Sequence, residues 1–319
     1  MTETLFQKEN PTTPEAIQTI PLALLLDVDG VLTDPTYKEV LQPEIFNHLE
    51  NHMQIGNAVT LNTGRSNEWM IKRIIKPLGE KVSNKSILTN FFAVGEKGLT
   101  WISFDPSGNL IEGFFDRNGE LVEGFDKSVF LDKETVEQFN LLETETKELV
   151  KRPDVAETTF FDSSKKAMIS TEMHDKYPDH KKYADNQIQF TAELKRLIQK
   201  AGLEDEFDVD PTTIATDIQL TNAGKHLGAK RILDWLGSKN IAPQHFVAFG
   251  DSDSDLAMAD ELASQGKSVD FFYVKPEKEL RVVKTFPIEI STMSFGEGTV
   301  EMFQKLESRK PSYKLPTSA

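Results

Sequence analysis

The 319-residue chain contains no cysteine. Disulfide bridges, thiolate metal sites and a cysteine nucleophile are therefore excluded, and a reducing compartment, the cytoplasm, is the expected location. No stretch approaches the roughly 18 consecutive apolar residues that a membrane-spanning helix needs. The opening residues, MTETLFQKENPTTPEAIQ, have neither a basic region nor an apolar stretch, so we expect no signal peptide and no membrane partner.

Positive charge is also scarce. The 36 Lys and Arg residues against 51 Asp and Glu residues give a formal net charge of −15. A protein that binds duplex nucleic acid needs a basic face, and no basic cluster in the sequence could form one. No internal repeat suggests a solenoid, and no segment points to a protein partner. An anionic substrate would therefore need a cation supplied locally by the site.

Short apolar runs bounded by turn-forming residues are typical of fully buried parallel strands. The sequence has four of them, at Leu22–Leu26, Ala58–Leu61, His245–Phe249 and Val269–Val274. Segments with the apolar spacing of helices alternate with these runs. This alternation predicts an α/β fold with a mainly parallel, Rossmann-like sheet.

The middle of the chain follows a different pattern. An apolar stretch at Phe91–Phe104, a turn signal at Pro106–Asn109 and further apolar residues indicate a hairpin. Charged, helix-like stretches follow at Lys133–Val150 and Gln189–Ala201. We predict an α+β cap domain inserted into a core domain, with a tail at each end. The predicted ranges are 90–212 for the cap, 20–89 and 213–307 for the core, and 1–19 and 308–319 for the tails.

Polar clusters follow three of the predicted strands directly, at Asp27–Asp29, Thr63–Arg65 and Asp251–Asp255. Because ligands of open α/β sheets bind outside the carboxyl ends of the strands, we expect these clusters to converge. Crowded carboxylates repel one another, and a hard divalent cation such as magnesium (Mg²⁺) relieves that repulsion. The predicted metal-ligating residues are Asp27, Asp29, Asp251 and Asp255.

A bound magnesium ion would attract phosphate oxygens. Lys225, at the start of a predicted helix, could supply a second positive charge, while Thr63 and Gly64 offer a hydroxyl and backbone N–H groups to an anion. Asp27 and Asp29, two residues apart at a strand end, could act as nucleophile and as general acid and base. The pattern therefore indicates phosphoryl chemistry.

In order and spacing these residues resemble the four motifs of the haloacid dehalogenase (HAD) superfamily of phosphohydrolases. Asp27-Val-Asp-Gly-Val matches the first motif and Thr63-Gly-Arg the second, Lys225 the third, and Gly250-Asp-Ser-Asp-Ser-Asp the fourth. The resemblance covers about residues 20–80 and 212–275. The long interval between the second and third motifs is where the superfamily's larger cap class is inserted, to which the Cof-type sugar-phosphate phosphatases belong.

The resemblance implies a magnesium-dependent phosphomonoesterase acting on a small phosphorylated metabolite, such as a sugar or polyol phosphate. Asp27 would be the nucleophile and a magnesium ligand, and Asp29 the acid and base, with its backbone carbonyl on the metal. Thr63 would hydrogen-bond the transferring phosphoryl group, and Lys225 would neutralise the aspartyl-phosphate. Two further carboxylates would hold the ion: Asp251 and Asp255.

Single motifs also fit other structures. The fourth motif looks like the start of a calcium loop, but Leu256 and Leu262 stand where such a loop needs Gly and Glu. Thr63-Gly64 could simply precede a helix capped by Ser66 or Asn67. Arg65 is expected to pair with a nearby acid.

Three questions stay open at the level of sequence. A phosphotransferase such as a mutase keeps the same residues, and a non-catalytic sensor of phosphometabolites could keep them as well. Glu96 and Lys97 could face the active site from the cap and help to select the substrate, although a solvated turn fits them equally well. Ser254 and His226 depart from the Cof-type pattern, which leaves the substrate class open.

Overall fold

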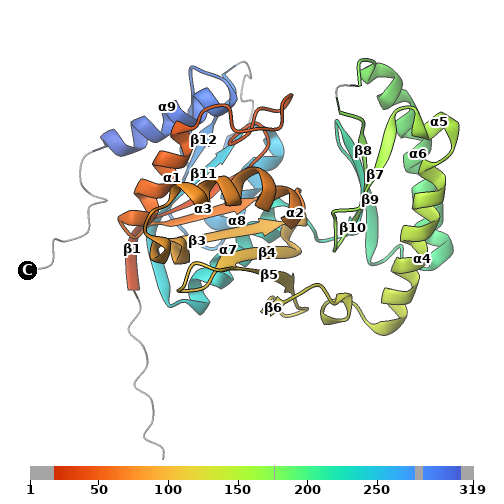
Figure 1. Cartoon of the computed structure of the whole chain (residues 1–319), viewed down its shortest axis with the longest axis horizontal. Helices are drawn as coiled ribbons and strands as arrows, with labels where there is room; N and C mark the ends of the chain where they lie inside the picture. The colour runs from red at the N-terminus through yellow and green to blue at the C-terminus, as the bar shows by residue number, and fades with distance from the viewer. Residues whose placement is uncertain (1–17, 176, 277–282, 310–319) are drawn as a thin grey trace, which may run out of the picture.

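The computed structural model describes residues 18–175, 177–276 and 283–309, so the predicted tails lie almost entirely outside the described residues. Within these residues the strands form one nine-stranded sheet, in the order β13-β12-β11-β1-β2-β3-β4-β5-β6, and one four-stranded sheet, in the order β7-β8-β10-β9. Figure 1 shows the two sheets as separate bodies, each with its own helices. This arrangement confirms the predicted α/β class.

The parallel part of the large sheet contains all four predicted strands. Its members are β13 (Ile288–Ile290), β12 (Val269–Tyr273), β11 (Ile241–Gly250), β1 (Gln18–Leu26), β2 (Ala58–Asn62) and β3 (Phe91–Gly95). Every residue of Leu22–Leu26 is buried. Leu22, Leu24 and Leu26 pack in the core on one face of the sheet, whereas Ala23 and Leu25 pack in the core on the other. Burial on both faces explains the unbroken apolar run.

Helices cover both faces of this sheet. One face carries α1 (Glu44–Gln54), α9 (Phe295–Ser308) and a continuous helical segment between residues 67 and 81. That segment consists of α2 (Asn67–Met70), a π-helical turn at Ile71–Ile75 and α3 (Lys76–Lys81). The other face carries α7 (Lys225–Ser238) and α8 (Leu256–Ser264). No helix among residues 18–175, 177–276 and 283–309 is long and apolar enough to cross a membrane.

The large sheet continues past β3 in antiparallel fashion, through β4 (Thr100–Phe104), β5 (Leu110–Phe115) and β6 (Leu121–Glu123). The predicted hairpin therefore exists, but it belongs to the core sheet. Trp101 and Phe115 pack in the same core as α7, which explains why this apolar segment stays with the core. The domain boundary predicted at residue 90 would cut one continuous sheet.

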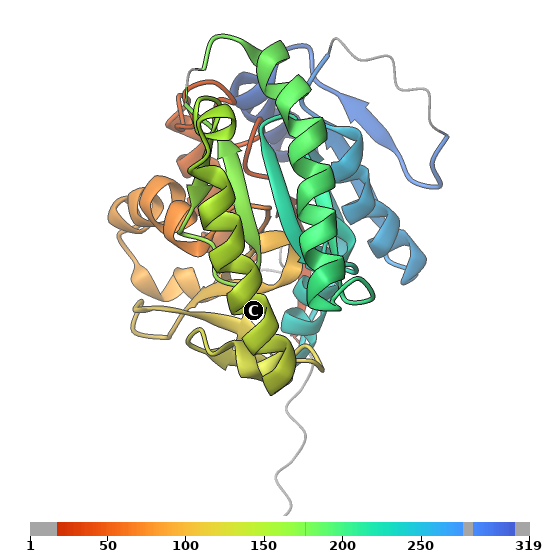
Figure 2. The same ribbon diagram turned by 90° about the vertical axis from the view of Figure 1, so that its right-hand side faces the viewer.

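The four-stranded sheet is antiparallel and consists of β7 (Thr159–Asp162), β8 (Ile169–Met173), β10 (Ala215–Leu220) and β9 (Phe207–Pro211). Helices α4 (Lys133–Val150), α5 (Pro153–Ala156) and α6 (His180–Ala201) pack on it around a separate apolar core. Figure 2 shows α4 and α6 side by side in front of the sheet.

The strand β10 was expected in the core, beyond residue 212, but it pairs with β8 and β9 of the small sheet. The large sheet ends with β6 at Glu123, and the next core element, α7, begins at Lys225. We therefore propose residues 124–224 as the inserted cap, which narrows the predicted range at its start and extends it at its end.

Candidate active site

The predicted polar clusters converge at the carboxyl ends of the parallel strands, where the cap faces the core. A cavity of about 530 Å³ lies there. Of the predicted site residues, the following line it: Asp27, Asp29, Thr63, Gly64, Lys97, Lys225, Asp251 and Asp255. Glu96 does not. Segments more than two hundred residues apart in the chain thus meet at one point, as expected for residues at the carboxyl ends of neighbouring strands.

Three carboxylates form the centre of the site. Asp27, Asp251 and Asp255 each offer one oxygen, and these oxygens all lie within 4.8 Å of one another. Asp27 follows β1, and the other two follow β11. The Oδ2 of Asp255 accepts hydrogen bonds from the backbone N–H groups of Asp251, at 3.2 Å, and Ser252, at 3.0 Å. The loop after β11 therefore fixes the Asp255 side chain toward the cluster.

Two glycines of the motifs are needed for this close approach. Gly30 has a φ of +74°, and a Cβ at that position would lie 2.4 Å from the Oδ2 of Asp251. A Cβ at Gly250 would lie 2.3 Å from the Cβ of Asp255. Any larger residue would push the carboxylates apart, and the left-handed conformation of Gly30 adds strain for other residues.

The electrostatics of the three carboxylates fit a divalent cation. Burial raises the pKa of Asp27 well above its ordinary value, the nearby Asp255 raises it further, and Lys225 offsets this only in part. Burial and Asp255 likewise raise the pKa of Asp251 to about 6. Such crowding of hard oxygen ligands is the arrangement that a divalent ion stabilises.

Lys225, the first residue of α7, is the cation of the site. Its Nζ forms ion pairs with Asp27 and, at 2.8 Å, with Asp255. Burial lowers the pKa of Lys225, but the two carboxylates outweigh it, so the pKa lies above the ordinary value. The Nζ also donates to the carbonyl oxygen of Asn62 at 2.8 Å, and the Asn62 amide donates to the Lys225 carbonyl at 2.7 Å.

Asn62 was not identified as a site residue from the sequence. It is buried, ends β2, and secures Lys225 across 163 positions of the chain. A Cβ at Gly228, one turn along α7, would lie 2.0 Å from the Asn62 Oδ1, so that glycine makes room for the contact. The only signal in the sequence is that Asn62 directly precedes the second motif.

Thr63 and Gly64, the predicted phosphate-binding residues, line the cavity beside the carboxylates. Thr63 is buried, and its backbone N–H and C=O are held by Val94 and by Lys97, both at 3.0 Å. Its hydroxyl accepts the Arg65 N–H at 3.2 Å. The helix-start interpretation is also correct, because Ser66 caps α2 by accepting the N–H of Trp69.

Asp29 has a different environment from the other three predicted metal ligands. Arg65 grips its carboxylate with two hydrogen bonds, Nε to Oδ2 and Nη2 to Oδ1, both at 2.8 Å. Burial raises the pKa of Asp29, but the charge and hydrogen bonds of Arg65 lower it below the ordinary value. The Asp29 side chain therefore pairs with Arg65 and does not join the carboxylate cluster. Arg65 was expected to pair with a nearby acid, and that acid is Asp29.

The two residues predicted to select substrate form the turn between β3 and β4, and both join core to cap. Glu96 is fully buried, and its carboxylate accepts the backbone N–H groups of residues 166 to 168. Lys97 lines the cavity, but its Nζ already binds Asp210 at 2.6 Å, Asp217 at 2.8 Å and Gln219 at 2.5 Å. Glu96 is thus an anchor of the cap, away from the cavity.

The cap wall of the cavity was not predicted residue by residue. It consists of Lys165, Glu172, Asp217 and the segment 212–215. Lys165 donates to the carbonyl of Gly64, which brings the cap against the predicted phosphate-binding turn. No motif marks these residues, because they come from separate strands of the small sheet.

No protein-family model and no curated protein sequence matches the chain. Solved structures do resemble it. The Thermoplasma acidophilum protein 0175 has 15% identity and a TM-score of 0.52, with 91% of this chain and 99% of that chain covered. Aspergillus fumigatus trehalose-6-phosphate phosphatase has 14% identity and a TM-score of 0.52, with 91% and 93% covered. Plasmodium falciparum IMP-nucleotidase has 15% identity and a TM-score of 0.50.

The chain has the HAD fold. The likeness extends over nearly the whole of the first two structures, cap included, whereas the chain spans 58% of the length of the nucleotidase. Within the HAD fold, the cluster of Asp27, Asp251, Asp255 and Lys225 occupies the strand-end position that the sequence motifs predict.

Proposed function

We propose that the protein is a magnesium-dependent phosphomonoesterase that hydrolyses a small phosphorylated metabolite through an aspartyl-phosphate on Asp27. The observation that carries the proposal is the ion-paired arrangement of Lys225 between Asp27 and Asp255, with Asp251 beside them, in the wall of one cavity. Structures with the same fold include a trehalose-6-phosphate phosphatase and an IMP-nucleotidase, which supports phosphate-ester chemistry.

The residues present fit a magnesium ion. Asp27, Asp251 and Asp255 would hold it through their carboxylates, and Asp29 would add its backbone carbonyl. Once bound, the ion would supply positive charge to the oxygens of the phosphoryl group. Lys225, the Thr63 hydroxyl and the Gly64 N–H would contact the same oxygens.

In the first step a carboxylate oxygen of Asp27 attacks phosphorus, and the bond between phosphorus and the ester oxygen breaks. Because Arg65 keeps Asp29 ionised in the free protein, Asp29 must first take up a proton as the anionic substrate enters. It then gives that proton to the departing alkoxide, so that the products are an alcohol and an aspartyl-phosphate. Lys225, in contact with Asp27, offsets the negative charge that the substrate phosphate brings beside the Asp27 carboxylate, and would neutralise the aspartyl-phosphate. A cap closed over the substrate would exclude water from the cavity during this step.

In the second step Asp29, now a carboxylate, takes a proton from a water molecule as that water attacks phosphorus. The bond between phosphorus and Asp27 breaks, and inorganic phosphate leaves. Thr63, fixed by Val94 and Lys97, would keep the phosphoryl group in place through both steps.

A sugar or polyol phosphate is the substrate class that the cap wall favours. Thr213 lines the cavity, and its hydroxyl can hydrogen-bond to the hydroxyl groups of such a molecule. The Cof-type subclass and the cytoplasmic location predicted from the sequence remain part of this proposal.

The test is phosphate release from a panel of sugar and polyol phosphates and from 4-nitrophenyl phosphate. The assay is run with magnesium, with a chelator, and with the Asp27→Asn variant. We expect release that needs magnesium and is lost in Asp27→Asn. Transfer of phosphate to a second metabolite would point to a phosphotransferase. Tight binding of a sugar phosphate without release would point to a sensor.

A further inference from the structure

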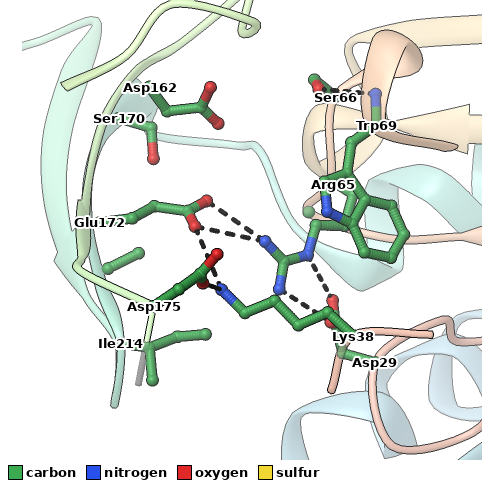
Figure 3. A network of polar contacts seen from close by, with 12 residues as sticks. Asp29, Lys38, Arg65, Ser66, Trp69, Asp162, Ser170, Glu172, Asp175 and Ile214 are labelled. Atoms are coloured by element: carbon green, nitrogen blue, oxygen red, sulfur yellow. Dashed lines mark hydrogen bonds and ion pairs between the residues drawn. The ribbon is translucent and has the colours of Figure 1, made fainter. Parts of the chain in front are cut away.

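A chain of charged side chains runs from the core to the cap beside the active site (Figure 3). Arg65, which follows β2, holds Asp29 with its Nε and Nη2 at 2.8 Å. Its remaining nitrogen, Nη1, lies 3.4 and 3.3 Å from the two carboxylate oxygens of Glu172 on β8 of the cap. One guanidinium thus joins the predicted acid and base of the core to a carboxylate of the cap.

The Arg65 guanidinium is held on three sides. Asp29 takes the fork formed by Nε and Nη2, Glu172 faces Nη1, and the Trp69 ring lies 4.8 Å from the guanidinium carbon. The side chains of Arg65 and Glu172 are 8% and 9% exposed. An arginine fixed in this way presents its planar fork to a carboxylate in one orientation only.

Of the three residues that hold the Arg65 guanidinium, only Glu172 belongs to the cap; Asp29 and Trp69 belong to the core. If β8 moved away from the core, Nη1 of Arg65 would lose its partner and water would reach the guanidinium. The remaining pair with Asp29 would then be a half-exposed ion pair, in which the side chains are held only weakly. The orientation of Asp29 therefore depends on where the cap stands.

We propose that Arg65 is a positioning residue that couples the cap to Asp29, and that Glu172 fixes Arg65 only while the cap covers the cavity. The proposal rests on the proposed function in one respect, the role of Asp29 as acid and base. Its consequence is that the proton donor is in place when the substrate is enclosed and is released when the cap withdraws.

A second ion pair across the same boundary provides a matched control. Lys38 of the core binds Asp175 of the cap at 2.7 Å, and the Asp175 side chain is 73% exposed. Lys38 also lies 3.9 Å from Glu172, at the edge of the same network. Asp175 contacts neither Arg65 nor Asp29 in any hydrogen bond or ion pair of the described residues. Its loss removes a cap carboxylate but leaves the hydrogen bonds of Arg65 to Asp29 and Glu172 in place.

The kinetic test compares substrates that need the acid with substrates that do not. An alkyl phosphate has a poor leaving group and requires the proton of Asp29, whereas 4-nitrophenyl phosphate leaves without one. The comparison uses kcat/KM, which reports the formation of the aspartyl-phosphate and not the later step in which Asp29 acts as the base. We expect Glu172→Gln and Arg65→Lys to lower kcat/KM for the alkyl phosphate roughly tenfold or more, and for 4-nitrophenyl phosphate by less than about threefold. Asp175→Asn should change both by less than about twofold.

Two kinetic results would overturn the coupling. One is an equal loss of kcat/KM on both substrates. The other is a rise in KM alone, which would make Glu172 a substrate-binding residue. If the wild-type protein releases no phosphate, or if the release does not depend on Asp27, the proposed function is refuted. The coupling is then judged by a measurement that needs no turnover.

That measurement is the NMR signal of the Arg65 side-chain Nε–H in protein labelled with ¹⁵N-arginine, assigned by its loss in Arg65→Lys. In the wild type this proton is hydrogen-bonded to Asp29 and should exchange slowly with water. We expect Glu172→Gln to speed its exchange several-fold and Asp175→Asn to leave it unchanged. Equal exchange in the wild type and Glu172→Gln would show that Glu172 does not hold Arg65.

Discussion

On the core side of the cavity, Asp27, Thr63 and Asp251 each stand directly after a buried parallel strand, and the charges there pair with one another. On the cap side, Glu172 and Asp217 come from separate antiparallel strands, and both pair with cations of the core. The core wall is thus complete in itself, whereas the cap wall is held in place by polar contacts across the boundary.

Two lysines show what this difference means. Lys225 lies between Asp27 and Asp255, all within the core, while Lys97 reaches from the core to Asp210 and Asp217 of the cap. Each neutralises two carboxylates, but only Lys225 contacts the predicted nucleophile. Similar ion pairs thus have different roles: the pair on the core wall contacts the predicted nucleophile, and the pair on the cap wall attaches the cap to the core.

The largest effect is expected from Lys225→Met. Without this cation, Asp27 loses its ion-pair partner and the repulsion between its carboxylate and the substrate phosphate is less offset, so kcat should fall about 100-fold or more at saturating magnesium. The measurement is steady-state phosphate release, with thermal unfolding as the check that the variant is folded. A folded variant with nearly unchanged kcat would remove Lys225 from the proposed mechanism.

Lys97→Met should give a smaller effect of a different kind. Asp217, which is buried, loses the cation that lowers its pKa, and the cap loses an attachment point. We expect KM to rise about tenfold, with kcat changed by less than about threefold. A fall in kcat as large as that of Lys225→Met would break the division between the two walls.

A third test changes the core wall without touching the cavity. A Cβ in Gly228→Ala would lie 2.0 Å from the Asn62 Oδ1, so the Asn62 amide and the Lys225 contact it supports must shift. We expect kcat to fall several-fold and the unfolding free energy to drop by about 2 kcal/mol. In the same helix, a Cβ at Gly237 meets nothing within 4 Å. Gly237→Ala should therefore keep full activity and add up to about 1 kcal/mol of stability.

The smallest effect on activity is expected far from both walls, at His52 of α1. Burial lowers the pKa of His52 to about 4, although Glu307 opposes the shift. Because the folded protein favours the neutral ring, stability is full above pH 6.5 and falls as the pH drops toward 4. Urea unfolding should show a loss of about 2 kcal/mol between pH 7.5 and pH 5 from this group. His52→Gln should reduce that loss and leave kcat unchanged, and an equal loss in both proteins would contradict the assignment.

The parallel core and its site could be predicted from the sequence because both depend on local patterns. A run such as Leu22–Leu26 is apolar throughout since both faces of its strand are buried, and the residues after it must lie at the sheet edge. The convergence of Asp27, Asp251 and Lys225 then follows from topology alone.

The cap boundaries and the cap wall could not be predicted in the same way. The sequences of Phe91–Gly95 and Thr100–Phe104 do not show whether their hairpin joins the core sheet or begins a new one. That placement depends on packing against α7. The contact of Arg65 with Glu172 joins positions 107 residues apart, and no spacing rule indicates it. Asn62 was missed for the same reason.

The central claim, that Asp27 becomes phosphorylated while the cap only encloses the substrate, can be tested by trapping the intermediate. Protein turning over an active phosphate ester is treated with borohydride, which reduces an aspartyl-phosphate to homoserine, and its peptides are analysed by mass spectrometry. We expect homoserine at position 27, only when substrate is present, and none in Asp27→Asn. Homoserine at Asp29 instead, or none during active turnover, would contradict the account.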